Sequence, residues 1–412
     1  MTKNSYLCKF ISENEDWEER LSKYPFFIHI KKDGDLAIFN YNLIASEAIE
    51  ENGEEMIARI DFTIPEVQES RGIIINHKKC EVVCWPFRKF GNFGESYVDN
   101  IDWKSASVQE KVDGSIMKLW FDKRPEHRLW RISTNGVIDA FTCKSQFGNV
   151  YGEMFLEASR KQNLDLEKLD VDNTYIFELV GPFNRVVVEY PETMIYHTGT
   201  RNNITGQEQE TDIGIIKPKK YKLTSLEDCI EAAKALNTIN TDNRFDVQQE
   251  GFVVVDANFN RIKIKSPQYV AVHHAFNGGI LSRKRAMDMI LENEDEEYLT
   301  YFPEYKTLFD TLKDGMKKTQ DVIEKYCEQA MSVYKKNNYS RKEFATTFGK
   351  DKLFYFAMQY VFGEQPLSQV SHRLSRKSWL KWIETIDNYD FEKMNPAVTK
   401  EFNNIKTIKK ER

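Results

Sequence analysis

The first 275 residues carry short hydrophobic runs that have the length and composition of β-strands. The runs are rich in β-branched and aromatic residues, and turn-forming sequences such as Asp113-Gly114 and Gly181-Pro182 separate them, a pattern typical of antiparallel strands. We predict strands at Gly72–Ile75, Val82–Trp85, Ile116–Phe121, Tyr175–Val180, Arg185–Tyr190 and Met194–Tyr196. Two more runs, Phe252–Asp256 and Ile262–Lys265, flank a turn-forming sequence and predict a hairpin.

The pattern changes after about residue 275, where apolar residues recur at intervals of three and four, as in helices. The repeat includes Leu308, Leu312, Met316, Val322, Tyr326, Met331 and Tyr334. Capping-box sequences predict one helix over 225–236 and another that begins at Ser340. The sequence therefore predicts an α+β protein with two domains. The first, 1–275, is built on antiparallel sheets and includes 1–100 as an integrated N-terminal extension, and the second, 276–412, is all-helical.

The composition is that of a folded protein, with 41% hydrophobic and 13% aromatic residues in 412. No run approaches about 20 apolar residues, and the N-terminus has no apolar signal-peptide core. The six cysteines include no C-x-x-C pair, so the sequence indicates neither a zinc site nor a disulfide framework. We therefore expect a cytoplasmic protein in a reducing compartment, with no membrane contact.

The formal net charge is −6, from 58 basic and 64 acidic residues. This excludes a protein coated in basic residues, but it permits a local basic groove, because the field depends on how charge is distributed. The acidic stretches 13–19 and 292–297 are expected to supply opposing charge away from such a groove.

Three charged side chains stand next to or inside predicted strands. Lys111 precedes Asp113-Gly114, where the glycine lets the backbone approach a ligand closely. Glu178 is the one charged residue of an apolar strand, and Glu250 with Gly251 opens another. A buried carboxylate is costly unless it meets a cation, a metal or a hydroxyl. Each residue alone also has an ordinary interpretation as a solvated turn or edge-strand residue.

Four further cations complete the set of candidate residues. Strand alternation places Lys263 and Lys265 on one face, about 7 Å apart, a spacing that suits a di- or triphosphate. Upstream, Arg71 and Lys89 are interleaved with aromatic residues. The alternatives are a solvated lysine face on the strand and a surface loop with hydrophobic anchors.

In this order and spacing the motifs resemble those of covalent nucleotidyltransferases, a superfamily of DNA ligases, RNA ligases and mRNA capping enzymes. Over about 60–275 the finer resemblance is to the RNA ligase 1 family, typified by the tRNA-repair ligase of T-even bacteriophages. The residues that carry it are Ser70-Arg71-Gly72-Ile73, Arg88-Lys89-Phe90, Phe177-Glu178, Gly181-Pro182, Asn184-Arg185, Lys263-Ile264-Lys265-Ser266, Tyr269-Val270 and His273.

One departure from the family pattern concerns a strand lysine that relatives carry just before a glycine. Here the stretch reads Arg131-Ile132-Ser133-Thr134-Asn135-Gly136, which contains no lysine. Arg131 is a candidate to supply that charge from another position.

The resemblance implies an antiparallel-sheet nucleotidyltransferase core, an ATP-grasp-like ligase fold, followed by an all-α C-terminal domain. It implies an ATP-dependent RNA ligase that joins 5′-phosphate and 3′-hydroxyl RNA ends, acting in RNA or tRNA repair. In the implied reaction, Lys111 attacks the α-phosphate of ATP and forms a lysyl–AMP. The AMP then passes to an RNA 5′-phosphate, and a 3′-hydroxyl displaces it.

The resemblance also assigns roles within the site. Lys111 is the catalytic residue, and ATP binds at Arg71, Lys89, Lys111, Gly114, Glu178, Glu250, Lys263 and Lys265. Glu250 and Glu178 are the candidate ligands of Mg²⁺, for which Mn²⁺ is an alternative. A free lysine is protonated at neutral pH, so nearby cations or a metal must favour its neutral form. Tyr196 and His197 are candidates to stack on adenine.

The helical C-terminal region helps to choose among the superfamily members. DNA ligases and GTP-dependent capping enzymes follow the core with a β-rich OB-fold, so helices favour an RNA ligase. A non-catalytic RNA-binding protein is the alternative from another class. The expected partner is RNA, with a nicked tRNA anticodon loop as the narrower candidate, and no protein partner is indicated. Within 371–382, cations and aromatics suit RNA contacts, or an amphipathic helix that buries Leu374 and Trp379.

Overall fold

The computed structural model describes residues 4–43, 45–51, 54–236, 249–274, 281–349, 351–363, 374 and 376–387. The chain forms two compact units. The first comprises 1–45, 59–280 and 296–301, and the second comprises 46–58, 281–295 and 302–412. The sequence prediction placed a single boundary at 275. The structure places the main boundary after 280, and it also assigns 46–58 to the second unit and 296–301 to the first.

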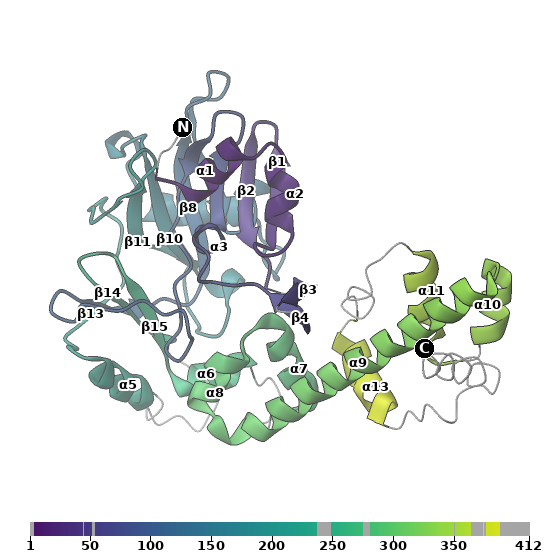
Figure 1. The fold of residues 1–412 in the computed structure, drawn as a ribbon. Helices are drawn as coiled ribbons and strands as arrows, with labels where there is room; N and C mark the ends of the chain where they lie inside the picture. Colours follow the sequence, from purple (N-terminus) through teal and green to yellow (C-terminus); the bar gives the residue numbers. More distant parts are fainter. Residues whose placement is uncertain are drawn as a thin grey trace. The chain divides into compact units, whose positions relative to one another are not determined.

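An N-terminal antiparallel sheet has the order β1-β2-β5-β6 (Figure 1). Its strands are β1 (Ile28–Asp33), β2 (Leu36–Tyr41), β5 (Arg71–Asn76) and β6 (Glu81–Cys84). Alternate residues of β2 pack on opposite faces, as the strand geometry requires. Ala37 and Phe39 pack in the core with α1 (Tyr6–Glu13) and α2 (Trp17–Ser22), while Leu36 and Ile38 pack against Trp120 of β8.

The second sheet has the order β12-β11-β10-β8-β9 and is also antiparallel. It consists of β8 (Ser115–Asp122), β9 (Leu129–Thr134), β10 (Asn173–Val180), β11 (Met194–Asn202) and β12 (Glu208–Gln209). One face, which includes Met117, Phe177 and Leu179, packs against Met154 and Phe155 of α4 (Tyr151–Lys161). The other face of β8 and β10 is therefore available to line a site.

The third sheet, of order β13-β7-β14-β15, carries the predicted hairpin. Its strands are β7 (Ser107–Lys111), β13 (Lys220–Tyr221), β14 (Gly251–Val255) and β15 (Arg261–Lys265). Its apolar face, with Val108, Phe252 and Ile264, packs against α5 (Leu226–Ala235). Because the strands alternate, Lys111, Lys263 and Lys265 lie on the opposite face.

The second unit is largely helical, around the long helix α9. Its principal core combines residues of α9, α10 and α11 with Ile386 of α13. The helices are α7 (Arg283–Glu292), α9 (Lys306–Asn337), α10 (Arg341–Phe348), α11 (Phe354–Phe362) and α13 (Arg376–Asp387). The remaining elements are β3 (Ser46–Glu51), β4 (Glu54–Arg59), α3 (Pro65–Glu69), α6 (Pro267–His274), α8 (Asp295–Tyr301) and the short 3-10 turns Ala140–Thr142, Leu166–Lys168, Pro182–Asn184 and Pro303–Tyr305.

The structure confirms the predicted α+β class and the helical C-terminal region. The predicted hairpin and the helix after Ser225 form, and Ser340 makes the predicted capping box. The strand predicted at 185–190 is wrong, because the structure has bends there. Trp379 is buried, with 2% of its surface exposed, which favours the amphipathic-helix interpretation of that segment. Residues 371–373 and 375 lie outside the described residues.

Candidate active site

Lys111 lies at the end of β7, where the register of the third sheet aligns three motifs. Gly251 is paired with both Lys111 and Lys265, so the two lysines flank it on neighbouring strands. The Lys111 Nζ donates to the Glu250 Oε2 at 2.6 Å, and the two side chains are 21% and 4% exposed. Residues 139 positions apart in the sequence are thus held as a largely buried ion pair.

Asp113 anchors the loop that follows Lys111. Its Oδ2 accepts hydrogen bonds from the backbone N–H groups of Val187 and Val188, at 2.8 and 2.7 Å. Its Oδ1 accepts from the Tyr269 hydroxyl at 2.7 Å. These bonds explain the error at 185–190, because Val187 and Val188 give their N–H groups to a carboxylate instead of to a neighbouring strand. The sequence contains this signal only as the aspartate of the Lys111 motif.

Gly114 passes directly against β10. A Cβ added there would lie 2.2 Å from the Leu179 carbonyl oxygen, which no real side chain tolerates. The glycine is therefore required by packing between the loop and β10. The expectation that Gly114 lets the loop approach a nucleotide stays a prediction.

Glu178 extends from β10 into the cavity that Lys111 and Glu250 also line. Burial raises the pKa of Glu178 to about 7, the charge of Lys111 opposes that rise, and the charge of Glu250 adds to it. Burial also raises the pKa of Glu250, against the opposing effect of Lys111. Two carboxyl groups that disfavour each other's ionisation thus share one cavity with a lysine, an arrangement typical of functional sites.

Three cations at this site make no ion pair in the described part of the chain: Arg71, Lys89 and Lys263. Arg71 and Lys263 both lie over the ring of Phe90, at 5.2 and 5.0 Å from its centroid. Burial lowers the pKa of Lys263 well below its usual value, and the charges of Lys89, Lys265 and Arg71 lower it further. Glu95 opposes this decrease, but three cations act in the other direction. Cations that repel one another favour binding of a polyanion.

Lys89 occupies a different environment from the other two cations. Its ammonium lies 5.4, 4.9 and 5.7 Å from the ring centroids of Tyr41, Phe62 and Tyr97. Such cation–π contacts stabilise a charge without neutralising it. Lys89 is not among the residues that line the cavity, so it acts on the site through its charge.

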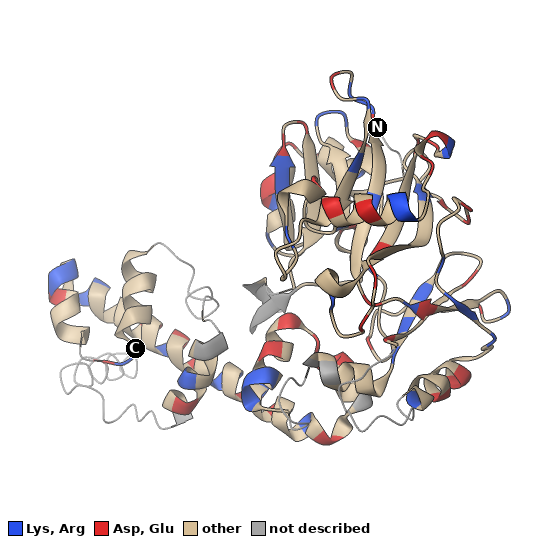
Figure 2. Ribbon diagram, turned by 180° about the vertical axis from the view of Figure 1, so that it is seen from behind, with Lys and Arg blue, Asp and Glu red and all other residues tan. Residues whose placement is uncertain are grey.

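The acidic stretch 292–297 does not lie wholly away from the site, which corrects the sequence expectation. The Glu297 Oε1 and the Lys265 Nζ are 3.0 Å apart. The reason is that 296–301 belongs to the first unit, although the residues on both sides belong to the second. Elsewhere on the ribbon, basic and acidic residues are interspersed (Figure 2).

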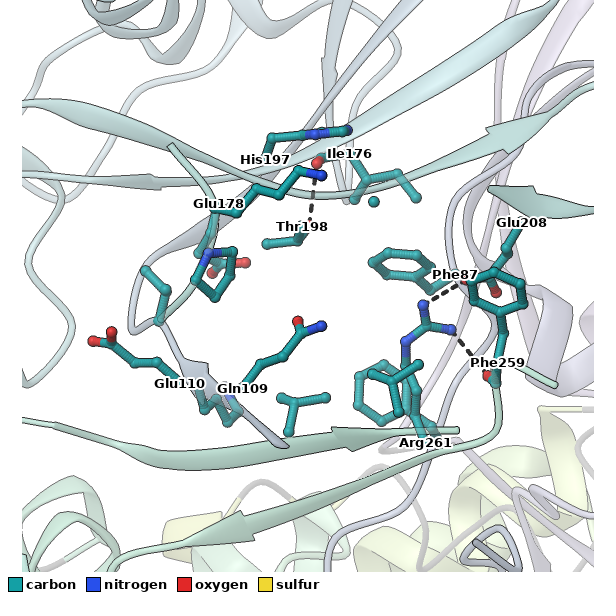
Figure 3. Close-up of a pocket in the computed structure, with 18 of the residues that line it drawn as sticks. Phe87, Gln109, Glu110, Ile176, Glu178, His197, Thr198, Glu208, Phe259 and Arg261 are labelled. Carbon is teal, nitrogen blue, oxygen red and sulfur yellow. Dashed lines mark hydrogen bonds and ion pairs between the residues drawn. The ribbon is translucent and has the colours of Figure 1, made fainter. Parts of the chain in front are cut away.

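The far end of the cavity was not predicted. There the Arg261 guanidinium lies 2.5 Å from the Glu208 carboxylate and 4.1 Å from the centroid of the Phe87 ring (Figure 3). Gln109 points into the space between the two sheets, and Glu110 points away from it. Strand alternation from Lys111 would have found Gln109. No local pattern connects Arg261 with Glu208, because a sheet-to-sheet contact brings them together.

Of the two candidates for stacking on adenine, His197 lines the cavity, and its ring also contacts neighbouring side chains. The His197 ring lies 5.5 Å from the ring of Phe177, and its Nε2 is 2.9 Å from the Thr200 Oγ1. Burial lowers the pKa of His197 to about 4, so it is neutral near pH 7. Tyr196 does not line the cavity.

Arg131 is wrong as the substitute for the missing strand lysine. Its guanidinium is 3.3 Å from the Asp122 carboxylate and 5.7 Å from the centroid of a Trp120 ring. It lies outside the set of cavity-lining residues. Its charge is thus already balanced by Asp122.

A divalent cation would find few protein ligands here. Among the described residues, no group of three or more His, Cys, Asp or Glu side chains is arranged to hold a metal. The half-buried Glu178 and the buried Glu250 fit a cation that takes its other ligands from phosphate oxygens and water, as Mg²⁺ does. In the part of the chain that the structure describes, no helix is long and apolar enough to cross a bilayer.

The site combines a lysine, two carboxyl groups and several cations, which is the set of groups that the predicted nucleotidyltransferase resemblance implies. Residues 69–269 match the model of a family described as RNA ligase. This segment, which carries the candidate site, is similar to that family, and the predicted resemblance is confirmed over it.

Individual relatives agree with the family match. A putative bifunctional polynucleotide kinase/RNA ligase of Autographa californica nuclear polyhedrosis virus is 30% identical over 274 residues, which cover 61% of this chain but 37% of the viral protein. An RNA ligase of Rhodothermus phage RM378 is 24% identical over 345 residues, covering 67% and 77% of the two chains. Among solved structures, an archaeal ATP-dependent RNA ligase matches 64% of this chain and 72% of its own, at 14% identity and a TM-score of 0.39.

Proposed function

We propose that the protein is an ATP-dependent RNA ligase that joins 5′-phosphate and 3′-hydroxyl ends through a lysyl–AMP at Lys111. One observation carries the proposal. A largely buried lysine, held 2.6 Å from Glu250, shares a cavity with Arg71 and Lys263, which make no ion pair in the described residues. A nucleophile next to unbalanced cations suits attack on a nucleoside triphosphate.

In the first step, the Nζ of Lys111 forms a bond to the α-phosphorus of ATP, and the bond to the pyrophosphate oxygen breaks. The attack needs the neutral amine. Arg71 and Lys263 stabilise the negative charge that collects on the departing pyrophosphate, with Lys89 adding its field. Glu178 accepts a hydrogen bond from a ribose hydroxyl.

In the second step, an oxygen of the RNA 5′-phosphate attacks the same phosphorus, and the bond to Lys111 breaks. In the third step, the 3′-hydroxyl attacks the activated 5′-phosphate and releases AMP. Lys111 is thereby restored, and the same cations neutralise each phosphate in turn.

Glu178 and Glu250 are the groups that would hold a divalent cation, Mg²⁺ or Mn²⁺, together with phosphate oxygens. When bound, such a cation would replace the Lys111 ammonium as the partner of Glu250 and polarise the phosphate. The carboxylates themselves orient Lys111 and the ribose.

Covalent labelling tests the proposal. The protein is incubated with α-labelled ATP or GTP and a divalent cation, denatured and examined for bound label. We expect label from ATP, none in Lys111→Ala, and full labelling in Lys123→Ala, a control at an exposed lysine that pairs with Asp172. Label from GTP alone would indicate a capping enzyme, and no label from either nucleotide would leave a non-catalytic RNA-binding protein.

The substrate is tested by competition among nucleic acid ends. We propose RNA ends, with a tRNA cleaved in the anticodon loop as the preferred form, in keeping with the family resemblance. Joining is compared on single-stranded RNA, a cleaved tRNA and nicked duplex DNA. Preferred sealing of the DNA nick would overturn the RNA assignment, and equal joining of both RNAs would remove the tRNA preference.

A further inference from the structure

Lys118 is a fully buried lysine with no acidic partner among the described residues. It lies on β8 with 0% of its surface exposed. Its face of the strand is the one that carries Ile116, which lines the cavity, and Trp120, which lies in the core. A buried unpaired ammonium is costly, whereas an apolar side chain of similar volume at such a position is often neutral or stabilising. Stability alone therefore does not account for Lys118.

The Lys118 ammonium donates to the carbonyl oxygen of Gly72. Gly72 interrupts the pairing of β2 with β5: Phe39 is opposite Ile73 and Asn40 is opposite Arg71, so Gly72 is the extra residue of a β-bulge. A bulge leaves a residue without its ladder partner and redirects the neighbouring side chain. Lys118 thus pairs with the residue that directly follows Arg71.

The bulge is enclosed as well as hydrogen-bonded. Gly72 has φ +79°, and a Cβ there would lie 2.7 Å from the Asn135 carbonyl oxygen and 2.8 Å from the Lys118 Nζ. Burial lowers the pKa of Lys118 to about 8, and the positive charge of Arg71 contributes to the decrease. Lys118 therefore contacts the bulge and is close enough to Arg71 for the two positive charges to repel each other, although Lys118 does not line the cavity itself.

We propose that Lys118 is a positioning residue for nucleotide binding: it fixes the Gly72 bulge and so holds Arg71 toward the phosphates. The inference rests on the proposed function, because it assigns the anion to the triphosphate tail. Lys118 is also a buried lysine near the site, in a chain where Arg131 does not replace the missing strand lysine.

The test is a double-mutant cycle in the full-length chain. Arg71→Ala, Lys118→Met and the double variant are assayed for covalent labelling over a range of ATP concentrations, and urea unfolding is measured for each. Lys118→Met keeps the volume of the side chain and removes the donor. We expect it to unfold at the same or a higher urea concentration, while the ATP concentration for half-maximal labelling rises about tenfold. The maximal labelling rate should change less.

The interaction between the two substitutions decides the result. If Lys118 acts through Arg71, the double variant requires no more ATP than Arg71→Ala alone. Multiplied effects, or a Lys118→Met variant that labels like the wild type, would overturn the proposal. Lys123→Met, which alters an exposed lysine, is the control and should label normally.

Two additions keep the test decisive. Gly72→Ala disturbs the bulge from the opposite side and should raise the same ATP requirement, so a normal requirement in that variant would also overturn the proposal. Equilibrium binding of pyrophosphate, which needs Arg71 but no covalent step, is measured in parallel. If the wild type binds pyrophosphate more tightly than Lys118→Met but is never labelled, the proposed function fails and the positioning role stands. If the wild type neither binds pyrophosphate nor is labelled, both fail.

Discussion

At the scale of single residues, several buried charges have pKa values displaced from their usual range. Glu69, next to the Arg71 motif, is 6% exposed and accepts hydrogen bonds from the Ser5 hydroxyl at 3.0 Å and the Leu7 N–H at 2.8 Å. Burial raises its pKa to about 7, against the effect of these hydrogen bonds. The carboxylate thus joins α1 to the start of β5 at a cost that depends on pH.

The sign of that dependence follows from proton linkage. Between pH 4.5, the usual pKa, and about 7, the folded state binds more protons at Glu69 than the unfolded state, so stability falls as pH rises. We expect Glu69→Gln to remove this contribution, which is at most about 3 kcal/mol. The measurement is the free energy of unfolding in urea at pH 5 and pH 8. Parallel pH profiles for the two proteins would contradict the prediction, and Glu66→Gln on the same helix is the control.

Gly251 shows a steric requirement at the same scale. Its φ is +151°, and a Cβ there would lie 2.1 Å from the Ile264 carbonyl oxygen. We expect Gly251→Ala to destabilise the protein by about 2 kcal/mol or more and to lower covalent labelling, because Lys111 and Lys265 are both paired with this residue. Gly136→Ala, whose Cβ would meet nothing within 4 Å, is the matched control. Equal stability of the two variants would refute the steric argument.

At the scale of elements, the helical unit depends on local signals. The Ser340 side chain accepts from the Glu343 N–H at 3.3 Å, and the Glu343 carboxylate accepts from the Ser340 N–H at 2.8 Å. This reciprocal cap begins α10, whose Phe344 and Phe348 are fully buried in the core with α9. The cap therefore fixes where an apolar helix face starts.

We expect Ser340→Ala to destabilise the helical unit by about 1 kcal/mol. The substitution removes the hydroxyl that accepts from the Glu343 N–H and donates to the Glu343 carboxylate. Thermal unfolding followed by far-ultraviolet circular dichroism measures the change. Ser332→Ala, in the last third of α9, serves as the comparison and should have little effect. An unchanged unfolding temperature in Ser340→Ala would mean that the cap contributes nothing measurable.

At the scale of the whole molecule, positive charge is concentrated at the site although the net charge is negative. The chain carries a net charge of −6, and yet three cations at the site make no ion pair in the described residues. A body of this kind repels nucleic acid in general and attracts phosphate at one place.

This distribution predicts how RNA binding depends on salt. With about three phosphate contacts, the logarithm of the binding constant should fall with the logarithm of salt concentration at a slope near −2. Titration of a fluorescent 5′-phosphorylated RNA at several salt concentrations measures it, and Lys263→Ala should reduce the slope by about 0.7. A slope steeper than about −5 would instead indicate a broad basic surface.

The sequence by itself determined the elements whose signals are local. Runs of β-branched and aromatic residues specified β5, β8, β10 and the β14–β15 hairpin, and N-terminal capping sequences specified α5 and α10, since these signals depend on residues a few positions apart. It also singled out Lys111, Glu178, Glu250, Lys263 and Lys265, because charged residues next to or within apolar strands stand out without any structure.

Only the tertiary structure decided what depends on contacts between distant segments. The 185–190 run is no strand because Asp113, more than 70 residues earlier, takes its N–H groups. Arg131 is balanced by Asp122, Glu297 reaches Lys265, and buried Lys118 meets the Gly72 bulge. Strand order and sheet packing set these contacts, and the free energy of a buried charge depends on neighbours that local sequence does not specify.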